Sequence, residues 1–226
     1  MKKKCILCVV AHPDDEALGV GGTLIKHVER GDKVNIIILS EGEGAKLLKK
    51  ERNINRLSNA YKWSKLAGTK LLKVFDFPDQ KFDSIPQIEI VSAIEKEVKV
   101  VKPDIVYTHF LYDINKDHQV TAEAVMVALR PISKFGLVSE IRAFETPSTT
   151  DQNPKIKDYS FAPNLYINVT NQWKKKASFL KAYSKEMKKF PHPRSLKSIK
   201  ALALKRGSEC MQDLAEAFIV IRKIEK

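Results

Sequence analysis

Long apolar runs are missing from this sequence. No hydrophobic stretch approaches the roughly 20 residues that a membrane-spanning helix requires. We therefore expect a soluble protein with no membrane partner and, by default, a cytoplasmic one. The start, Met1 to Lys4 followed by a short apolar run, lacks a small-residue cleavage site, so it predicts a first strand rather than a secretory signal.

Cysteine is also scarce, with three residues in 226. Cys5 and Cys8 have a Cys-x-x-Cys spacing, but residues three apart in an extended strand point to opposite faces, and structural zinc needs further soft ligands. We assign them no function. Linkers, repeats and low-complexity segments are missing too, and 43% hydrophobic content suffices for one buried core, so we expect a single domain over residues 1–226.

Acidic residues are too few to balance the basic ones, and the net charge is +13. The excess is concentrated between Trp173 and Arg206, where twelve Lys or Arg face one acid, Glu186. A solvated helical surface, an anionic substrate and a nucleic-acid contact would each explain this basic segment. Nucleic acid is the least favoured, because the carboxylate cluster described next would repel phosphates unless a cation intervened.

Strand-like and helical segments alternate along the chain. The predicted strands cover residues 5–10, 33–39, 71–77 and 105–108, followed less regularly by 141–145, 165–169 and 217–221. The predicted helices cover residues 21–30, 47–67, 86–101 and 118–129, with further helices in the basic segment. This order predicts an α/β, Rossmann-like fold, with a mostly parallel sheet flanked by helices in three layers and ligands bound beyond the carboxyl ends of the strands.

Polar residues crowd together directly after the first predicted strand. His12, Asp14, Asp15 and Glu16 lie within five residues, and mutual repulsion of three carboxylates is unfavourable unless a cation compensates. His118 follows the fourth predicted strand, so it would meet this turn at the same edge of the sheet. Two imidazoles and one carboxylate make a catalytic zinc site, although the same ligands can hold iron. The alternative is a polar turn and a helix capped by Asp117.

These motifs resemble those of the LmbE-like (PIG-L) zinc-dependent N-acetylglucosaminyl deacetylases. The residues that carry the resemblance are Ala11-His12-Pro13-Asp14-Asp15-Glu16 with Gly19, Gly21 and Gly22, then His109 through Asp113, Asn115 and Asp117-His118, with weaker echoes in Ala215 to Phe218. The resemblance implies the LmbE-like fold, an amino-sugar substrate and a homo-oligomer. It also implies that His12, Asp15 and His118 bind one zinc ion, and that Asp14 is the general base for the water that attacks the acetamide.

The chain departs from the family pattern at one position. Many members read His-x-Asp-His where this sequence has Asn115-Lys116-Asp117-His118. Asn115 can donate a hydrogen bond but cannot supply a proton, so His109 is the candidate substitute; its alternative is a histidine that ends a buried strand. We expect Asp117 to orient a metal-bound imidazole.

Two further positions resemble substrate-binding residues of the family. Arg56 falls near a family arginine, but Asn59 stands where a glutamate is more common, so a solvated helix surface is the alternative. Asp79 resembles a residue at the pocket rim, or is simply a turn former. The expected activity is zinc-dependent removal of an N-acetyl group from an N-acetylglucosamine-type sugar or conjugate. A related amidase on another acyl amine and, less favoured, a nucleotide-binding or nucleic-acid-binding module remain alternatives.

Overall fold

The apolar segments of the sequence form one sheet. The structure, a computed structural model, describes residues 3–42, 56–132 and 138–225, in which seven strands take the order β3-β2-β1-β4-β5-β7-β6. The parallel part contains β1 (Cys5–Val10), β2 (Lys33–Ile38), β3 (Lys70–Val74), β4 (Ile105–His109) and β5 (Glu140–Phe144). β7 (Ala215–Lys223) pairs antiparallel with both β5 and β6 (Leu165–Asn168). The predicted mostly parallel sheet is confirmed.

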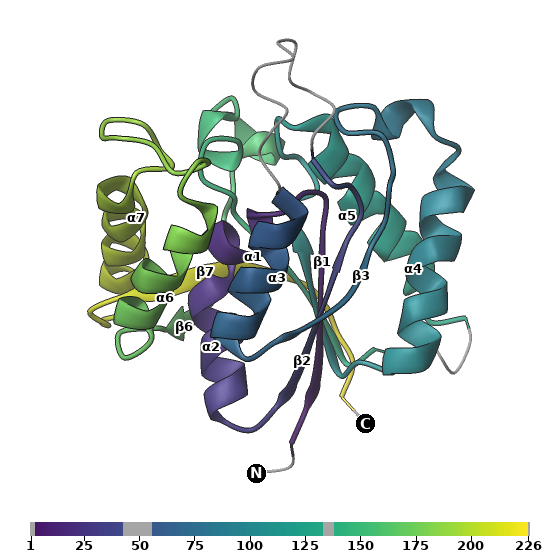
Figure 1. Cartoon of the computed structure of the whole chain (residues 1–226), viewed down its shortest axis with the longest axis horizontal. Coiled ribbons are helices and arrows are strands. Elements are labelled where there is room, and N and C mark those ends of the chain that lie inside the picture. The colour runs from purple at the N-terminus through teal and green to yellow at the C-terminus, as the bar shows by residue number, and fades with distance from the viewer. Residues whose placement is uncertain (1–2, 43–55, 133–137, 226) are drawn as a thin grey trace.

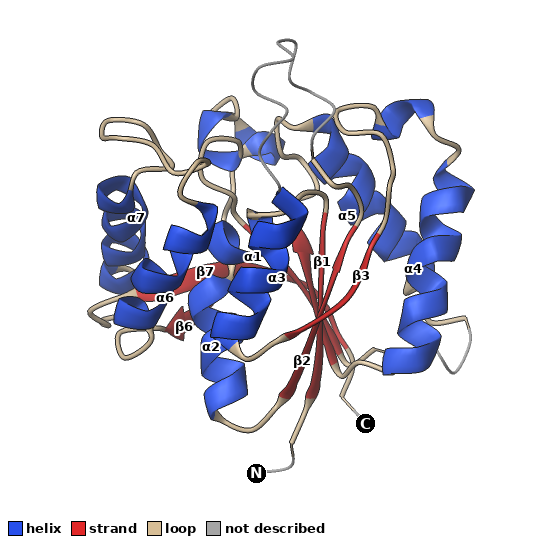
Figure 2. Ribbon diagram, viewed as in Figure 1, coloured by secondary structure: helices blue, strands red, loops and turns tan. Residues whose placement is uncertain are grey.

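Helices cover both faces of this sheet (Figures 1 and 2). One face carries α1 (Asp15–Gly19), α2 (Gly21–Glu29), α3 (Arg56–Ala67), α6 (Trp173–Phe179) and α7 (Leu196–Ser208), and the other carries α4 (Gln87–Val101) and α5 (Lys116–Ala128). Each face of the sheet packs on its own hydrophobic core, and alternate residues of β1 belong to different cores. Ile6, Cys8 and Val10 face the α2 side, and Leu7 and Val9 face the α4 side. The three-layer arrangement is therefore confirmed.

Two glycines end helices where the sequence pattern predicted. Gly31 and Gly68, just beyond α2 and α3, have φ of +81° and +72°, a left-handed conformation that glycine adopts without steric penalty. Each lets the chain turn back into the next strand of the sheet.

Some boundaries differ from those predicted. Residues 47–55 of the predicted helix 47–67 lie outside the described residues, and the described remainder, Arg56–Ala67, is helical as predicted. β3 ends at Val74, although Phe75 and Phe77 still donate backbone hydrogen bonds to the end of β2. The short helix α1 was not predicted, because five residues are too few to show a helical period. None of the helices in the described ranges is long and apolar enough to cross a membrane.

Candidate metal centre

Two turns at the carboxyl edge of the sheet bring the motif residues together. The chain leaves β1 through Ala11 to Asp14, and Asp14 has φ 107°, a left-handed conformation that Asp tolerates better than most residues. This turn lets Asp15 Oδ2 accept the backbone N–H of His12 at 2.9 Å. β4 is the neighbour of β1, and the loop after it leads into α5, whose first turn carries His118. The predicted meeting of the two motifs is therefore observed.

His12, Asp15 and His118 form a buried triad around one oxygen atom. Asp15 Oδ2 lies 3.5 Å from His12 Nδ1 and 3.4 Å from His118 Nε2, and one ligand atom from each residue fits within 4.8 Å of the others. Zinc bonds of about 2.0–2.1 Å at tetrahedral angles place ligand atoms about 3.3 Å apart. The residues present therefore fit a zinc ion.

Asp117 holds the other nitrogen of His12. Its Oδ2 lies 2.9 Å from His12 Nε2, and its carboxylate also accepts the backbone N–H groups of Gln80 at 2.7 Å and Phe82 at 3.1 Å. Such a partner fixes the tautomer and direction of a ligating imidazole, here turning Nδ1 toward Asp15. Asp79 lies 3.1 Å from the same Nε2, so His12, Asp79 and Asp117 make a second possible group of ligands. The first group fits better, because the Asp117 oxygens already hold two N–H groups.

Asp113 holds His118, a role that the sequence analysis did not assign. Asp113 Oδ1 lies 3.3 Å from His118 Nδ1, although the geometry is poorer than that of a well-aligned hydrogen bond. The carboxylate is fully buried and accepts hydrogen bonds from the Asn115 N–H and from the Thr149 and Thr150 hydroxyls. The available signal was an acid placed just after β4 and five residues before a candidate ligand.

The carboxylates set the charge of both histidines in the metal-free protein. Burial disfavours an imidazolium at His118, but Asp15 and Asp113 outweigh it and raise its pKa to about 9. Burial is likewise outweighed at His12, whose pKa is raised by Asp117, Asp15 and Asp79. A metal ion must displace these protons, so its binding depends on pH.

Asp14 is held by two arginines and keeps one oxygen free. Its Oδ2 accepts a hydrogen bond from Arg194 Nη1 at 3.0 Å and lies 3.2 Å from Arg56 Nη2. Its Oδ1 is buried and accepts no hydrogen bond from any described residue. Burial, together with Asp15 and Glu186, raises the pKa of Asp14 despite both guanidinium groups. A fixed carboxylate with one open lone pair is suited to proton transfer.

Arg56 lies in the site and not on a solvated surface. It is 8% exposed, and its guanidinium donates to the carbonyl oxygens of Gly42 at 2.6 Å and Pro13 at 3.0 Å. Arg194, which the sequence analysis missed, comes from the loop before α7. Part of the basic segment therefore contributes to the site, since Glu186 and Arg194 line the cavity, and Lys176 is buried against Glu216. Most of its other lysines are exposed, as a solvated surface predicts.

A cavity of about 120 Å³ opens beside the triad. It is lined by His12, Asp14, Gly42, Arg56, Asp79, Gln80, Asn115, His118, Glu186 and Arg194. Asp79 both lines this cavity and belongs to a turn, in which Lys81 N–H bonds to the Pro78 carbonyl. Asn115 caps α5 by accepting the Asp117 N–H at 2.9 Å, so its amide nitrogen remains the donor available toward the cavity.

The structure corrects the expectation for His109. This residue does not line the cavity: it is fully buried, stacks on His118 at 3.9 Å between ring centroids, and accepts the Ala11 N–H on Nε2 at 3.0 Å. Burial and the neighbouring His118 lower its pKa to about 3. His109 is therefore a neutral ring that supports His118 from behind, and it is not placed to give a proton to a substrate.

The fold and this geometry define an α/β protein with a candidate metal centre of two histidines and one carboxylate. The model of the PIG-L family, described as GlcNAc-PI de-N-acetylase, matches residues 7–129, which include all three residues of the triad. The chain belongs to the PIG-L family.

Proteins similar in sequence to this chain are named for more than one activity. The uncharacterized deacetylase YaiS of Escherichia coli is 28% identical over 179 residues, covering 76% of this chain and 85% of YaiS. The diacetylchitobiose deacetylase of Thermococcus kodakarensis is 25% identical over 178 residues, covering 74% of this chain but only 64% of the relative. The 4-oxalmesaconate hydratase of Pseudomonas putida is 26% identical over 191 residues, covering 77% and 70%.

Solved structures share the whole architecture. The conserved protein TT1542 from Thermus thermophilus superposes with a TM-score of 0.78 at 21% identity, covering 99% of this chain and 97% of that one. At this identity the likeness shows the fold alone.

Proposed function

We propose that this protein is a zinc-dependent deacetylase that hydrolyses the N-acetyl group of an N-acetylglucosamine-type sugar or conjugate. One observation carries the proposal: His12 and His118 of the triad line the same cavity as Asp14, whose Oδ1 accepts no hydrogen bond from any described residue. The family description and the name of the diacetylchitobiose deacetylase support the choice of an acetylated amino sugar, and the name of YaiS supports deacetylation.

His12, Asp15 and His118 would hold the metal ion, zinc or, with the same ligands, Fe²⁺. When bound, zinc supplies a Lewis acid and lowers the pKa of a coordinated water molecule. The protein supplies the orientation, because Asp117 and Asp113 direct the ligating nitrogens toward Asp15.

Asp14 would move the proton. Its Oδ1 takes the proton of the attacking water, while Arg56 and Arg194 keep the carboxylate in one orientation through Oδ2. The same Oδ1 then returns the proton to the departing amine. The Asn115 amide would donate a hydrogen bond to the oxygen on which negative charge develops, the task that a histidine performs in other members.

The pairing of charges in the cavity favours an uncharged sugar. Arg56 and Arg194 both face Asp14 and Glu186, so their charges are balanced within the protein. We propose that Asp79 and Arg56 contact the sugar at the rim of the cavity. A single domain, a homo-oligomer and a cytoplasmic location stay predictions.

The first test is release of primary amine and acetate from N-acetylglucosamine, N,N'-diacetylchitobiose and an N-acetylglucosaminyl malate. The protein is compared as isolated, after chelator treatment, and after zinc is restored. We expect amine and acetate in equal amounts, lost on stripping and recovered with zinc. No release from any conjugate by zinc-loaded protein would contradict the proposed substrate class.

Asp14→Asn separates catalysis from folding and metal binding. Asn tolerates the left-handed backbone at this position and keeps the side-chain shape, so the variant should fold and bind zinc normally. Loss of the base should reduce kcat by about 10²–10⁴-fold. Turnover is measured beside zinc content, and an Asp14→Asn protein with unchanged turnover would refute the role of Asp14.

A second candidate is hydration of an unsaturated acid, because one relative of similar identity is named a 4-oxalmesaconate hydratase. This hydration reaction requires an anionic substrate and would release no amine. Loss of ultraviolet absorbance from an unsaturated dicarboxylate, without activity on any acetamide, would favour this candidate.

A further inference from the structure

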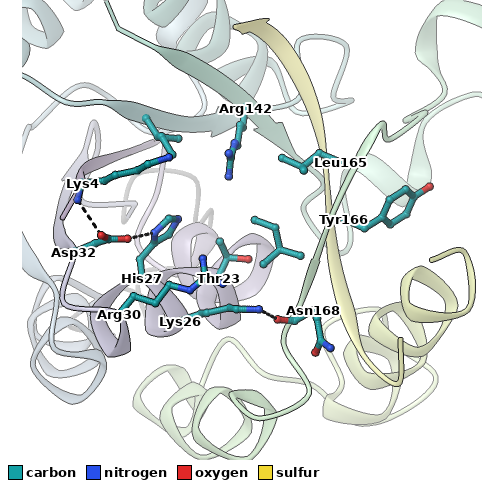
Figure 3. Close-up of a pocket in the computed structure, with 12 residues that line it drawn as sticks. Lys4, Thr23, Lys26, His27, Arg30, Asp32, Arg142, Leu165, Tyr166 and Asn168 are labelled. Carbon is teal, nitrogen blue, oxygen red and sulfur yellow. Dashed lines mark hydrogen bonds and ion pairs between the residues drawn. The ribbon is translucent and has the colours of Figure 1, made fainter. Parts of the chain in front are cut away.

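A second and larger cavity lies at the opposite end of the sheet from the triad. It has a volume of about 480 Å³, within the range typical of small-molecule sites. It opens between α2 and the amino ends of the strands, where Lys4 precedes β1, Asp32 precedes β2, and Ile105 begins β4 (Figure 3). No residue of the triad lines it.

Cationic side chains from three elements surround this cavity. Lys26 and Arg30 follow Thr23 and His27 along one face of α2, Lys4 reaches in from the start of β1, and Arg142 projects from β5 (Figure 3). Neither Lys4 Nζ nor the Arg30 guanidinium forms an ion pair or hydrogen bond with any described residue. Burial, and to a smaller extent the nearby Arg30, lower the pKa of Lys26.

The carboxylates near this cavity are already engaged. Asp32 Oδ2 lies 2.7 Å from His27 Nδ1, and His27 Nε2 lies 2.9 Å from the Tyr107 hydroxyl. Arg142 donates to that hydroxyl at 2.7 Å, and a bidentate pair at 2.8 Å joins it to Glu140. These hydrogen bonds fix Arg142 and His27 at the base of the cavity. Lys4 and Arg30 keep all their side-chain donors for a ligand, whereas Lys26 Nζ already donates to the Asn168 carbonyl and has its remaining N–H groups to offer.

Charge and shape together define the ligand. Four cations, Lys4, Lys26, Arg30 and Arg142, face two carboxylates, Asp32 and Glu140, so two positive charges remain in excess. A phosphate monoester carries about −1.5 to −2 charges at neutral pH, and arginine and lysine are its usual partners. The other wall is apolar, formed by Ile105, Leu165 and Ile167.

We infer that this cavity binds a small molecule with a phosphate monoester group. Lys4, Lys26 and Arg30 contact the phosphate, and Leu165 and Ile167 contact the organic part. The site is separate from the proposed catalytic centre, so it serves a ligand other than the acetamide that is hydrolysed.

Isothermal titration calorimetry of the full chain at low salt tests the inference. The probes are inorganic phosphate, glucose 6-phosphate and AMP, with glucose and adenosine as neutral counterparts. We expect the two esters to bind more tightly than inorganic phosphate, because only they reach the apolar wall, and the neutral compounds not to bind. Equal affinity for all three phosphates would identify a plain phosphate site, and binding of none would overturn the inference.

Paired substitutions locate the binding. Lys4→Gln with Arg30→Gln removes two exposed cations whose side chains form no hydrogen bond or ion pair with any described residue. The double variant should weaken ester binding by at least about tenfold, the effect of losing one charge-assisted hydrogen bond. The control is Lys96→Gln. Lys96 is exposed on α4, which covers the other face of the sheet, so the loss of its charge should change the affinity less than twofold. Equal affinity in the double variant and the wild type would place the anion elsewhere. Because no turnover is measured, these results do not depend on the deacetylase proposal.

Discussion

His12 and His118 present different ring nitrogens to Asp15, because each holds its other nitrogen against a different aspartate. Asp117 engages Nε2 of His12, and Asp113 engages Nδ1 of His118. The two positioning residues belong to one loop and the helix that follows it. A substitution of Asp113 or Asp117 should therefore lower the affinity for the metal ion.

Asp113→Asn should weaken zinc binding by about 10–100-fold, the usual effect of losing a residue that orients a ligand. The substitution keeps the shape of the side chain but removes the charge facing His118. Competition with a fluorescent chelator measures the affinity. Asp83→Asn, an exposed acid, is the matched control; equal affinities for the two variants would show that Asp113 has no influence on the metal.

Asn115 has two separable tasks, a helix cap and a proposed donor. Asn115→Asp retains an oxygen for the Asp117 N–H but loses the amide donor, whereas Asn115→Ala loses both. We expect both variants to lower kcat, and only Asn115→Ala to lose about 1 kcal/mol of unfolding free energy. Kinetics and urea unfolding are measured on the same samples. Unchanged kcat in Asn115→Asp would rule out the donor role.

At this scale the sequence located most of the candidate site. His12, Asp14, Asp15 and His118 were predictable because they follow strands that must be neighbours in a parallel sheet. Arg194 was not, because its approach to Asp14 depends on the path of a loop 180 residues further along the chain. For His109 the sequence left two interpretations open, and the structure supports the histidine that ends a buried strand; the sequence could not choose because it does not show that Nε2 accepts the Ala11 N–H.

The start of α2 depends on a buried ion pair. Glu216 of β7 accepts the backbone N–H groups of Gly22 at 2.8 Å and Thr23 at 2.7 Å, which satisfies two donors that a helix start leaves unpaired. Lys176 of α6 lies 2.7 Å from the same carboxylate and also donates to the Leu18 carbonyl. One buried contact thus joins β7, α6 and α2, the second helix after the turn that carries His12 and Asp14.

Lys176→Met should lower the free energy of unfolding by about 3–5 kcal/mol, because Glu216 would remain buried without its cation. Adding Glu216→Gln should recover part of the loss. Lys175→Met is the neighbouring control: its ion pair with Glu29 is exposed and is expected to contribute no more than about 1 kcal/mol. Urea unfolding compares the four proteins, and similar losses for Lys175→Met and Lys176→Met would contradict this account.

Element order was predictable because periodicity and glycine positions mark strands and helices locally. β1 was predicted with its observed bounds. The direction of β7 was not predictable, since an apolar run has the same pattern whether it pairs parallel or antiparallel. Its length was underestimated as well, because Glu216 and Arg222 belong to the strand only through pairing with β6 and β5.

For the whole molecule, His27 links stability to pH. Burial, with Arg142 and Arg30, lowers its pKa below the unfolded value of about 6.5. The unfolded chain therefore binds the proton first as pH falls, so this contribution is complete above about pH 6.5 and is lost below it, by at most about 1.4 kcal/mol per pH unit.

His27→Gln should accordingly lower the unfolding free energy at pH 7.5 relative to that at pH 5.5, compared with the wild type; the opposing contributions of His12 and His118 are common to both proteins and cancel in the comparison. Urea unfolding in a chelating buffer measures that difference for wild type, His27→Gln and His192→Gln, the last being an exposed histidine. If His192→Gln changed this pH difference and His27→Gln did not, the pH dependence would not come from His27.

The insertion of β7 between β5 and β6 has a consequence for biosynthesis. About 70 residues separate the end of β5 from the start of β7, so at roughly 5–20 residues per second the ribosome needs about 4–14 s to supply the partner of β5. During that interval the nascent chain exposes an unpaired strand edge of the kind that associates with other chains. A chaperone that shields this edge while translation continues would raise the yield of folded protein.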